Sequence, residues 1–321
     1  MAVTPLNTTG TINTGSGAAS TNPQAYFDRL LLELLVQTEF MHAKFAQERD
    51  LPKHGGNTVN FRKIVALKPE LTPLTEGVTP EGLTASLEAI TVSTKQYGDW
   101  LAFTDMVDVT QLDPIIKEYT VELARMAREK LDLITRDELN AGTNAFFANG
   151  KTSRVLLAAG DKPTVDDLRR IVLGMKERHV KPASGDRYVA FITPAVSFDL
   201  MDDPKFMKAY EIAQNGTPFI KGEIADIYGI KFVELVNAKV FAGEGAAGID
   251  VHSTLVIGRK PYGVTKIKGE GVQTIIKALG SSGVADPLNQ RQSIGYKINA
   301  YAVKRLYEEA IVRYESVPSN A

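Results

Sequence analysis

The chain has 321 residues and a formal net charge of −1, from 37 basic and 38 acidic side chains, and it contains no cysteine. This length suggests about two domains or one large domain, and the near-zero charge disfavours functions that gather polyanions such as bulk nucleic acid. The absence of cysteine excludes disulfides, thiolate nucleophiles and sulfur-ligated metal sites.

The amino-terminal part is predicted to contain a polar leader followed by an amphipathic helix. Residues 1–22 are rich in Thr, Asn, Gly and Ser, a composition that cannot pack a core. Asn22 and Pro23 suit the cap and first position of a helix that is predicted to run to about Arg49. Its wide apolar stripe would pack either on the subunit's own core or partly on a neighbouring molecule.

No targeting segment is expected. The start, MAVTPLNTTG, has neither a basic region nor an apolar core, so it does not read as a secretory signal. The longest apolar run, residues 30–36, contains Glu33 and is too short to span a bilayer. We therefore expect a protein that is soluble and intracellular when it is made.

A long hairpin is predicted between residues 58 and 104. Apolar residues alternate or nearly alternate along two arms, at Val59, Phe61 and Ile64 and then from Ile90 to Gln96. About twenty residues lie between the arms, whereas hairpin loops usually have two to five residues. The edges and tip of such a hairpin have no partner in their own chain and are hazardous unless another molecule covers them. The sequence therefore predicts a subunit that lies across a neighbour.

The tip of this hairpin is acidic. It carries Glu70, Glu76, Glu81 and Glu88, and no Lys or Arg occurs between residues 68 and 95. A run of like charges is usually a solvated surface, but complementary charge can also determine which neighbour the tip contacts.

The second arm leads back to the body of the molecule and into a long helix. Trp100, the only tryptophan, lies where the arm returns and is interpreted as a core or interface anchor. Asp113 and Pro114 suit the start of the helix, and Asn140 and Gly142 suit its end. About twenty-seven residues at 1.5 Å per residue give a helix of roughly 40 Å.

After Gly150 the pattern changes to alternating helices and strands, which is typical of a mixed α/β domain of about 120 residues. Thr164 is predicted to cap a helix, with Asp167 placed for a capping box. The other predicted elements are strands at 187–192, 230–236, 254–257 and 263–267 and a short helix at 195–201. From Ser293 the alternation resumes through residue 300 and again at 311–312, which predicts a return to a sheet beside the long helix.

Three sequence patterns suggest an enzyme, but the residues or predicted elements around each pattern argue against that function. The glycines from Gly243 to Gly248 fit a dinucleotide motif, but a strand rather than a helix is predicted to follow them. Residues 149–152 end like a phosphate-binding loop, but Ala145 stands where that motif requires glycine. The four histidines are scattered, and no pair has the spacing of a helical metal site.

Five segments, taken in chain order, carry a family resemblance. They are LTEGVTP in the tip, QYGDWLAFTDMVD on the returning arm, RDELNAGTN at the end of the long helix, GEIADIYGIKFVE in the α/β part and ADPLNQRQSIGYK near the end. Together they resemble the major capsid proteins of tailed bacteriophages, from about Tyr26 to Val312. Each segment alone is weakly specific, but five in the same order are strongly specific.

The resemblance implies an α+β fold of the Johnson type, also called Hong-Kong-ninety-seven-like. Its expected parts are an N-terminal arm and helix at 1–54, an extended β-hairpin loop at 55–104, a peripheral domain with the spine helix at 105–159 and 276–321, and a mixed α/β axial domain at 160–275. In this family the extended loop reaches over an adjacent subunit.

The resemblance also implies the function. We expect a major capsid protein that self-assembles through hexamers and pentamers into an icosahedral shell around phage double-stranded DNA, with no enzymatic activity, cofactor or metal. The expected partners are further copies of itself and portal, scaffold and cement proteins, with no membrane and no sequence-specific DNA binding. It would be made and assembled in the host bacterial cytoplasm and reside in the virion capsid.

Inter-subunit contacts are predicted at nine positions, which are Phe27, Leu31, Leu34, Glu76, Glu81, Trp100, Asp286, Asn289 and Arg291. Two other functions stay open. One is an encapsulin-like nanocompartment shell protein, which has the same fold but encloses a cargo enzyme. The other is a cytosolic α/β enzyme that uses a nucleotide, which only the glycines at 243–248 favour.

Overall fold

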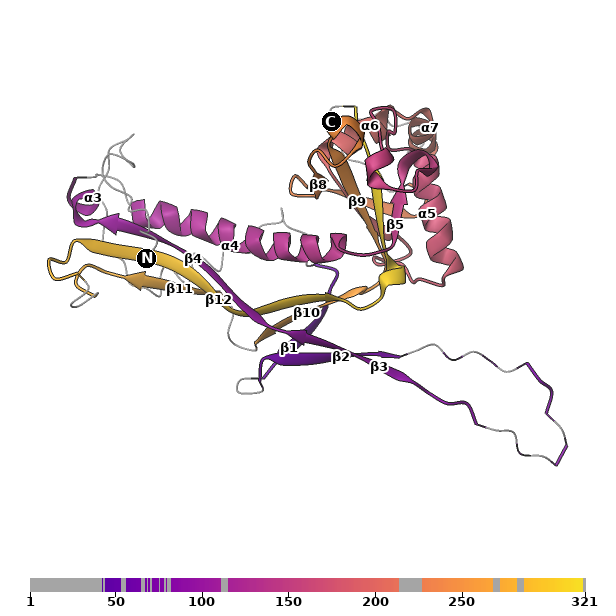
Figure 1. The fold of residues 1–321 in the computed structure, drawn as a ribbon, viewed down its shortest axis with the longest axis horizontal. Helices are drawn as coiled ribbons and strands as arrows, with labels where there is room; N and C mark the ends of the chain where they lie inside the picture. The colour runs from indigo at the N-terminus through magenta and orange to yellow at the C-terminus, as the bar shows by residue number, and fades with distance from the viewer. Residues whose placement is uncertain are drawn as a thin grey trace.

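The computed structural model describes residues 42, 44–52, 56–64, 67, 69, 71–74, 76–77, 79, 82–110, 115–213, 227–267, 272–281 and 286–319. A long helix lies along an elongated sheet, an α/β unit lies at one end of that sheet, and a narrow hairpin projects away from both (Figure 1).

Most of the helix predicted after Pro23 falls outside the described residues. Its predicted end at Arg49 is wrong, because residues 47–51 form a strand whose pairing with a distant strand overrides local helix propensity.

The elongated sheet has five strands, which are β1 (Gln47–Leu51), β4 (Lys95–Thr104), β10 (Tyr262–Ile267), β11 (Val272–Lys277) and β12 (Arg291–Arg305). The central strand β12 runs antiparallel to β10 and β11 along one edge and to β4 along the other. Strand β1 adds to β10 in parallel. The predicted return of the chain after Ser293 to a sheet beside the long helix is confirmed for β12.

The long helix is α4 (Ile115–Asn140), which follows the short helix α3 (Asp105–Thr110) and covers one face of the five-stranded sheet (Figure 1). Its 26 residues span about 39 Å at 1.5 Å per residue. Leu123, Ala127 and Leu139 on its inner side are buried in one core with residues of β12, which include Ile294, Tyr296, Ile298 and Tyr301. The predicted cap at 113–114 lies outside the described residues.

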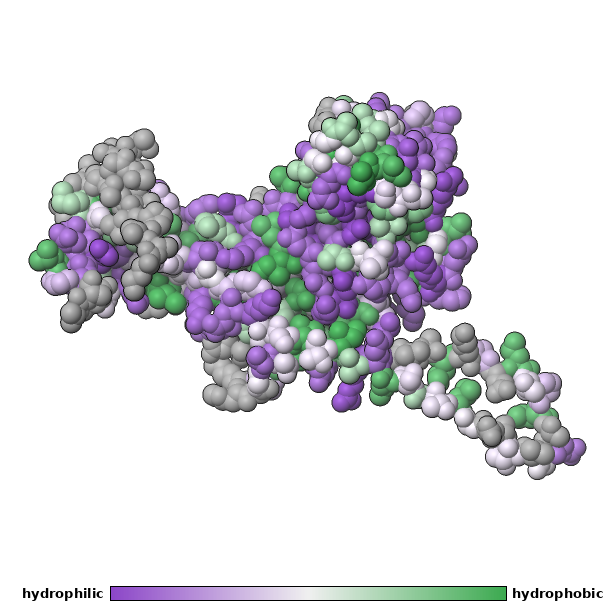
Figure 2. All heavy atoms as spheres, viewed as in Figure 1, coloured by the Kyte–Doolittle hydropathy of each residue, from purple (hydrophilic) through white to green (hydrophobic). Residues whose placement is uncertain are grey.

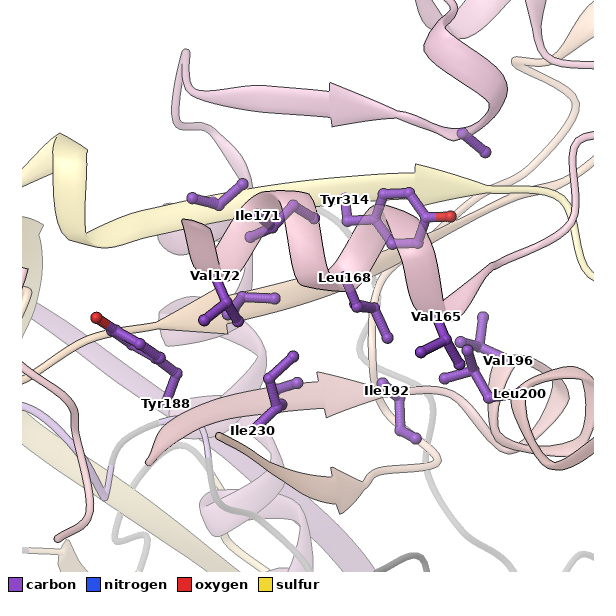
Figure 3. Close-up of a cluster of buried hydrophobic side chains, with 14 of the residues drawn as sticks. Val165, Leu168, Ile171, Val172, Tyr188, Ile192, Val196, Leu200, Ile230 and Tyr314 are labelled. Carbon is purple, nitrogen blue, oxygen red and sulfur yellow. The ribbon is translucent and has the colours of Figure 1, made fainter. Parts of the chain in front are cut away.

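The α/β unit is built on a six-stranded sheet, whose strands are β5 (Ala145–Phe147), β6 (Tyr188–Ile192), β7 (Ile230–Glu234), β8 (Val240–Phe241), β9 (Val251–Ile257) and β13 (Ile311–Ser316). Its helices are α5 (Val165–Glu177), α6 (Pro194–Asp202) and α7 (Pro204–Ala213). Buried side chains of α5, such as Leu168, share one core with Ile192 of β6 and Ile230 of β7 (Figure 3). All five residues of β6 are buried, as expected for a strand covered on both faces.

The strand pairing changes the expected organisation at two places. Strand β13 pairs with β5 and β9, so the prediction that residues 311–312 join the sheet beside the long helix is wrong. Conversely, β10 and β11 pair with β12 rather than with the strands of the α/β unit. The domain boundaries stay a prediction, but this pairing favours ending the α/β unit near residue 258 instead of 275, with β13 added to it.

Helix α5 begins at a capping threonine, as predicted. The Thr164 hydroxyl accepts a hydrogen bond from the Asp167 backbone N–H at 3.3 Å. We expect Thr164→Ala to lower the free energy of unfolding by about 1 kcal/mol, because one buried helix-end donor loses its acceptor. Urea unfolding of dilute, unassembled subunits measures this, and Thr164→Ser, which keeps the hydroxyl, should lose far less. Equal losses in the two variants would contradict the capping role.

The glycine pattern at 243–248 does not open an α-helix. Residues 246–248 form a single 3-10 turn, with Ala247 at a positive φ of 59°, and strand β9 follows at Val251. The contextual argument against a dinucleotide site is therefore confirmed, because no helix N-terminus faces the glycines.

A buried carboxylate joins the end of α4 to the α/β unit. Glu315 on β13 is fully buried and accepts two hydrogen bonds from the Arg154 guanidinium, each 2.7 Å long. Arg313 Nε lies 2.6 Å from the same carboxylate. The Arg313 guanidinium also donates to the backbone carbonyls of Asn140 and Gly142, where α4 ends. This network fixes how the long helix meets the six-stranded sheet.

A second buried pair fastens the chain where the described residues begin. The His42 backbone N–H donates to Asp132 of α4 at 2.8 Å, and its ring Nδ1 lies 2.6 Å from the other carboxylate oxygen. The Tyr262 hydroxyl donates to the His42 carbonyl, and the imidazole packs against Phe191 of β6. One residue thus contacts the long helix, the five-stranded sheet and the α/β unit.

Candidate assembly surfaces

The projecting hairpin consists of β2 (Thr58–Ile64) and β3 (Leu87–Ser93), paired antiparallel. Among the described residues these two strands form their own sheet and share no ladder with the larger sheets. A small cluster holds the base, made by Leu51, Val59, Phe61, Val92, Ala302 and Leu306. The Phe61 ring packs so closely over Gly263 that a Cβ there would lie 2.6 Å from it. The hairpin is therefore fixed at its base.

The hairpin loop, residues 65–86, and the strand after it present leucines to solvent. Five leucines are 55% to 90% exposed, namely Leu67, Leu71, Leu74, Leu83 and Leu87. Figure 2 shows green, hydrophobic residues along the projection. Burying one leucine is worth about 1.5–3 kcal/mol. The loop therefore gains stability chiefly by contacting another molecule.

The five-stranded sheet has a groove on the face turned away from α4, which we call the sheet groove. It has a volume of about 420 Å³, and its walls include Trp100 on β4 and Ile275 on β11. These side chains are 54% and 42% exposed. Gly295, the partner of Trp100 across the ladder, forms the floor, and a Cβ there would lie 2.7 Å from the Trp100 Cβ. Lys277 and Lys297 line the groove as well.

The other face of the same strands is locked to α4. Asp99 accepts hydrogen bonds from Lys130 Nζ at 2.7 Å and from the Tyr296 hydroxyl at 2.5 Å. Burial acts to raise the pKa of the Asp99 carboxyl, but these two hydrogen bonds outweigh it and leave the pKa below its ordinary value. Because successive strand residues point to opposite faces, locking Asp99 to the helix fixes Trp100 toward solvent.

A turn between β11 and β12 forms the far end of the sheet. Asp286 is buried, and its carboxylate accepts a hydrogen bond from the Arg291 backbone N–H at 2.7 Å. Asn289 has a positive φ of 52°, a conformation that asparagine tolerates better than most residues. Leu288, at the tip of this turn, is 76% exposed. Asp286 therefore shapes the turn, and Leu288 is the side chain that it presents.

A second groove lies on the α/β unit beside α5, and we call it the helix groove. It has a volume of about 510 Å³ and is lined by Leu173, Tyr228 and several charged side chains. Its arginines already have carboxylate partners, since Arg169 lies 3.5 Å from Asp166 and Arg170 lies 3.8 Å from Asp167.

The residues predicted as inter-subunit contacts lie at three separate places, as far as the structure describes them. Phe27, Leu31, Leu34 and Glu81 lie outside the described residues. Glu76 is exposed on the hairpin loop, Trp100 lines the sheet groove, and Asn289 and Arg291 are exposed on the turn. The interpretation of Trp100 as a core anchor is wrong for the single chain, because it is half exposed.

Sequence reasoning did not single out several exposed apolar residues of these surfaces, among them Leu71, Leu74, Ile275 and Leu288. For three of them a signal was available. Leu74 and Leu288 directly follow a proline and Leu71 lies two residues from one, in segments where no helical or strand period offers a core to bury them.

The part of the chain that the structure describes contains no group of three or more His, Asp or Glu side chains that could hold a metal ion. Within the same residues, every helix is too short or too polar to cross a membrane.

A family model described as phage capsid protein matches residues 88–314. Solved structures of phage capsids share the fold over most of the chain. The capsid of Ralstonia phage GP4 has a TM-score of 0.69 at 14% identity, covering 98% of both chains. The capsid of cyanophage P-SCSP1u has a TM-score of 0.64 at 12% identity, covering 86% of this chain and 87% of that one. Cyanophage Pam1 gives 0.63 at 16% identity over the whole of both chains. No curated protein matches significantly.

Proposed function

Because this chain belongs to the phage capsid protein family and has the Johnson-type fold, it is a major capsid protein, and we propose that its copies assemble through hexamers and pentamers into an icosahedral shell around phage double-stranded DNA. The observation that carries this proposal is the hairpin. A two-stranded projection with exposed leucines and unpaired strand edges promotes aggregation of an isolated subunit. In a subunit that lies against its neighbours, the same groups provide binding surface.

Many modest contacts suffice for such a shell. Each subunit offers four surfaces for contact, which are a projecting loop, the sheet groove, the helix groove and the turn around Leu288. When several such contacts form at once, the overall binding affinity greatly exceeds that of any single contact. The net charge of −1 suits a wall that encloses DNA without binding it tightly or by sequence. We further propose that portal, scaffold and cement proteins act with it, that it has no catalytic role, and that it is made and assembled in the bacterial cytoplasm.

Negative-stain electron microscopy of the purified protein tests this function. The expected result is closed shells built from rings of five and six subunits, which enclose genomic DNA when isolated from infected cells. A protein that stays a single 35.0 kDa subunit at every salt and crowding condition would contradict the proposal. Shells that contain a cargo enzyme instead of DNA would identify a nanocompartment.

Shortening the hairpin loop should abolish assembly while leaving the subunit folded. We expect that replacing residues 69–84 by a short Gly-Ser turn removes closed shells, because the change deletes three of the five exposed leucines and keeps the base cluster around Phe61. Particle counts by electron microscopy and circular dichroism of the same samples measure the two effects. Loss of the circular dichroism signal would show instead that the loop stabilises its own chain.

A further inference from the structure

The assembly surfaces leave one motif of the α/β unit unused, which is the pair Asn149 and Gly150 after strand β5. Both residues are exposed, and with the buried Ala148 they form a single 3-10 turn. In such a pair the backbone nitrogen of the glycine can attack the side-chain amide of the asparagine, and glycine has no Cβ to hinder the approach. Asparagine is accordingly one of the thermolabile residues of proteins. The turn therefore presents a reactive pair to water.

The folded turn keeps the two reacting atoms apart. Asn149 has a φ of 57° and a ψ of 23°, so its Cβ and the Gly150 nitrogen lie on opposite sides of the Cα–C bond. Closure of a ring between them requires both on the same side of that bond. Gly150 has a φ of 68°, and a Cβ added to it would meet nothing within 4 Å, so open space lies beside it. Rotation about the Asn149 Cα–C bond is therefore the step that would start the reaction.

A buried carboxylate holds the Asn149 side chain. Its amide nitrogen donates a 2.9 Å hydrogen bond to Asp161 Oδ1, and the other carboxylate oxygen accepts from the Ala158 N–H at 2.9 Å. Burial acts to raise the pKa of the Asp161 carboxyl, but these two hydrogen bonds outweigh it and leave the pKa below its ordinary value. The Asp161 carbonyl accepts from the Val317 N–H at 2.9 Å, directly after β13. One amide thus ties the turn to the chain that follows β13.

We propose that Asn149 is a site of spontaneous deamidation and that its hydrogen bond to Asp161 sets the rate. The Gly150 nitrogen bonds to Asn149 Cγ, the Cγ–Nδ2 bond breaks, and the amide nitrogen leaves as ammonia with the proton from Gly150. Water then opens the cyclic imide at either carbonyl, which gives aspartate or isoaspartate without an enzyme, oxidant or cofactor. Both products lose the donor to Asp161 and gain a negative charge near it, which weakens the connection to β13. This modification goes beyond the assembly function and does not depend on it.

Peptide mapping by mass spectrometry tests the modification in full-length, folded protein aged at mildly alkaline pH, with isoaspartate detected by enzymatic methylation. We expect Asn149 to convert slowly in the unaltered chain and roughly tenfold faster in Asp161→Ala, because a hydrogen bond to a charged group no longer holds the amide. Lys162→Ala changes the exposed residue next to Asp161 and should leave the rate as it is. Circular dichroism checks that each variant is folded. An Asn149 that stays intact in the unaltered chain, or equal rates with and without the Asp161 carboxylate, would overturn the proposal.

The reaction product gives a second test, which does not require Asp161→Ala to fold. Asn149→Asp keeps nearly the same shape and tolerates a positive φ, so it changes only the donor and the charge. We expect it to lower the urea midpoint of dilute subunits at neutral pH, because two carboxylates then face each other. Adding Asp161→Asn exchanges the partners, so an amide again donates to a carboxylate and the midpoint should recover. An unchanged midpoint in Asn149→Asp, or no recovery in the exchanged pair, would show that this contact does not hold the turn and would overturn the proposal.

Discussion

Glu315→Ala is expected to lower the free energy of unfolding by about 3–5 kcal/mol, the usual effect of removing one partner from a buried ion pair. The carboxylate is fully buried, and Arg154 binds it through two nitrogen atoms. Alanine would leave the Arg154 and Arg313 guanidinium groups largely shielded from water with one fewer anion between them. Arg154 would keep only Glu244, whose side chain is half exposed, so the desolvation of the two guanidinium groups would be offset less well.

Urea unfolding of dilute, unassembled subunits measures this effect. Glu315→Gln should lose less, because an amide still accepts a hydrogen bond from one guanidinium. A double-mutant cycle with Arg154→Met should give a coupling energy above about 0.5 kcal/mol, as expected for residues in direct contact. Additive effects would show that the two side chains stabilise the fold independently.

The same substitution should also affect assembly beyond its effect on folding. Arg313 donates to the carbonyls at the end of α4, and its guanidinium is held in place by Glu315. Loosening this junction frees the α/β unit to change its angle to the five-stranded sheet. A closed shell requires the same angle in many copies, so we expect broken or irregular particles under conditions where the subunit is still folded.

Elements that depend on local pattern were predictable from the sequence. The apolar period fixed α4 to within a few residues, a continuous apolar run indicated β6, and a threonine followed by an aspartate three residues later indicated the start of α5. Each of these signals lies within one element. The long polar segment between two alternating arms likewise indicated a projecting hairpin, because its length is itself the signal.

Features that depend on distant pairing were not predictable. Strand β1 looked helical because its partner β10 lies more than two hundred residues away in the sequence. Strand β13 was placed in the wrong sheet because an alternating pattern indicates a strand but does not indicate which strand it pairs with. The exposed loops posed a related problem. Asp286 is predicted as a contact residue, and only the three-dimensional path of the chain shows that its carboxylate also closes its own turn.

The sheet groove illustrates the same limit. Trp100 could be named as an anchor from sequence, but Ile275, Lys277 and Lys297 lie on two other strands and meet it only through the register of β12. Gly295 is required at the floor because its ladder partner is a tryptophan. No short motif encodes this combination, so a site of this kind emerges only from the assembled sheet.

Raising the pH above about 10 is expected to destabilise the folded subunit steeply, because five tyrosines are buried with their hydroxyl groups neutral, namely Tyr188, Tyr262, Tyr296, Tyr301 and Tyr314. Burial raises the pKa of Tyr301 from 10.0 to about 12. Burial also raises the pKa of Tyr262 and of Tyr314 further above the ordinary value. In the unfolded chain these phenols lose their protons near pH 10, whereas in the folded chain they keep them.

The sign of the effect follows from this difference. Below pH 10 both states bind the protons and stability is unaffected, but above pH 10 the unfolded state gains from ionisation that the folded state resists. Each buried tyrosine should remove roughly 1.4 kcal/mol per pH unit until its folded pKa is reached. For Tyr301 that window is pH 10 to about 12, and for Tyr262 and Tyr314 it continues upward.

Urea midpoints between pH 9 and 12, with tyrosinate absorbance followed in the same samples, measure the alkaline loss. Tyr301→Phe is the informative variant, because it removes one titrating hydroxyl and should make the decline shallower by roughly 1.4 kcal/mol per pH unit. It also removes the hydrogen bond to Thr135, so its stability at pH 7 should be slightly lower. The Thr135 hydroxyl still donates to the Leu131 carbonyl, so no buried donor is stranded. An unchanged slope in Tyr301→Phe would show that surface lysines, rather than buried phenols, govern alkaline unfolding.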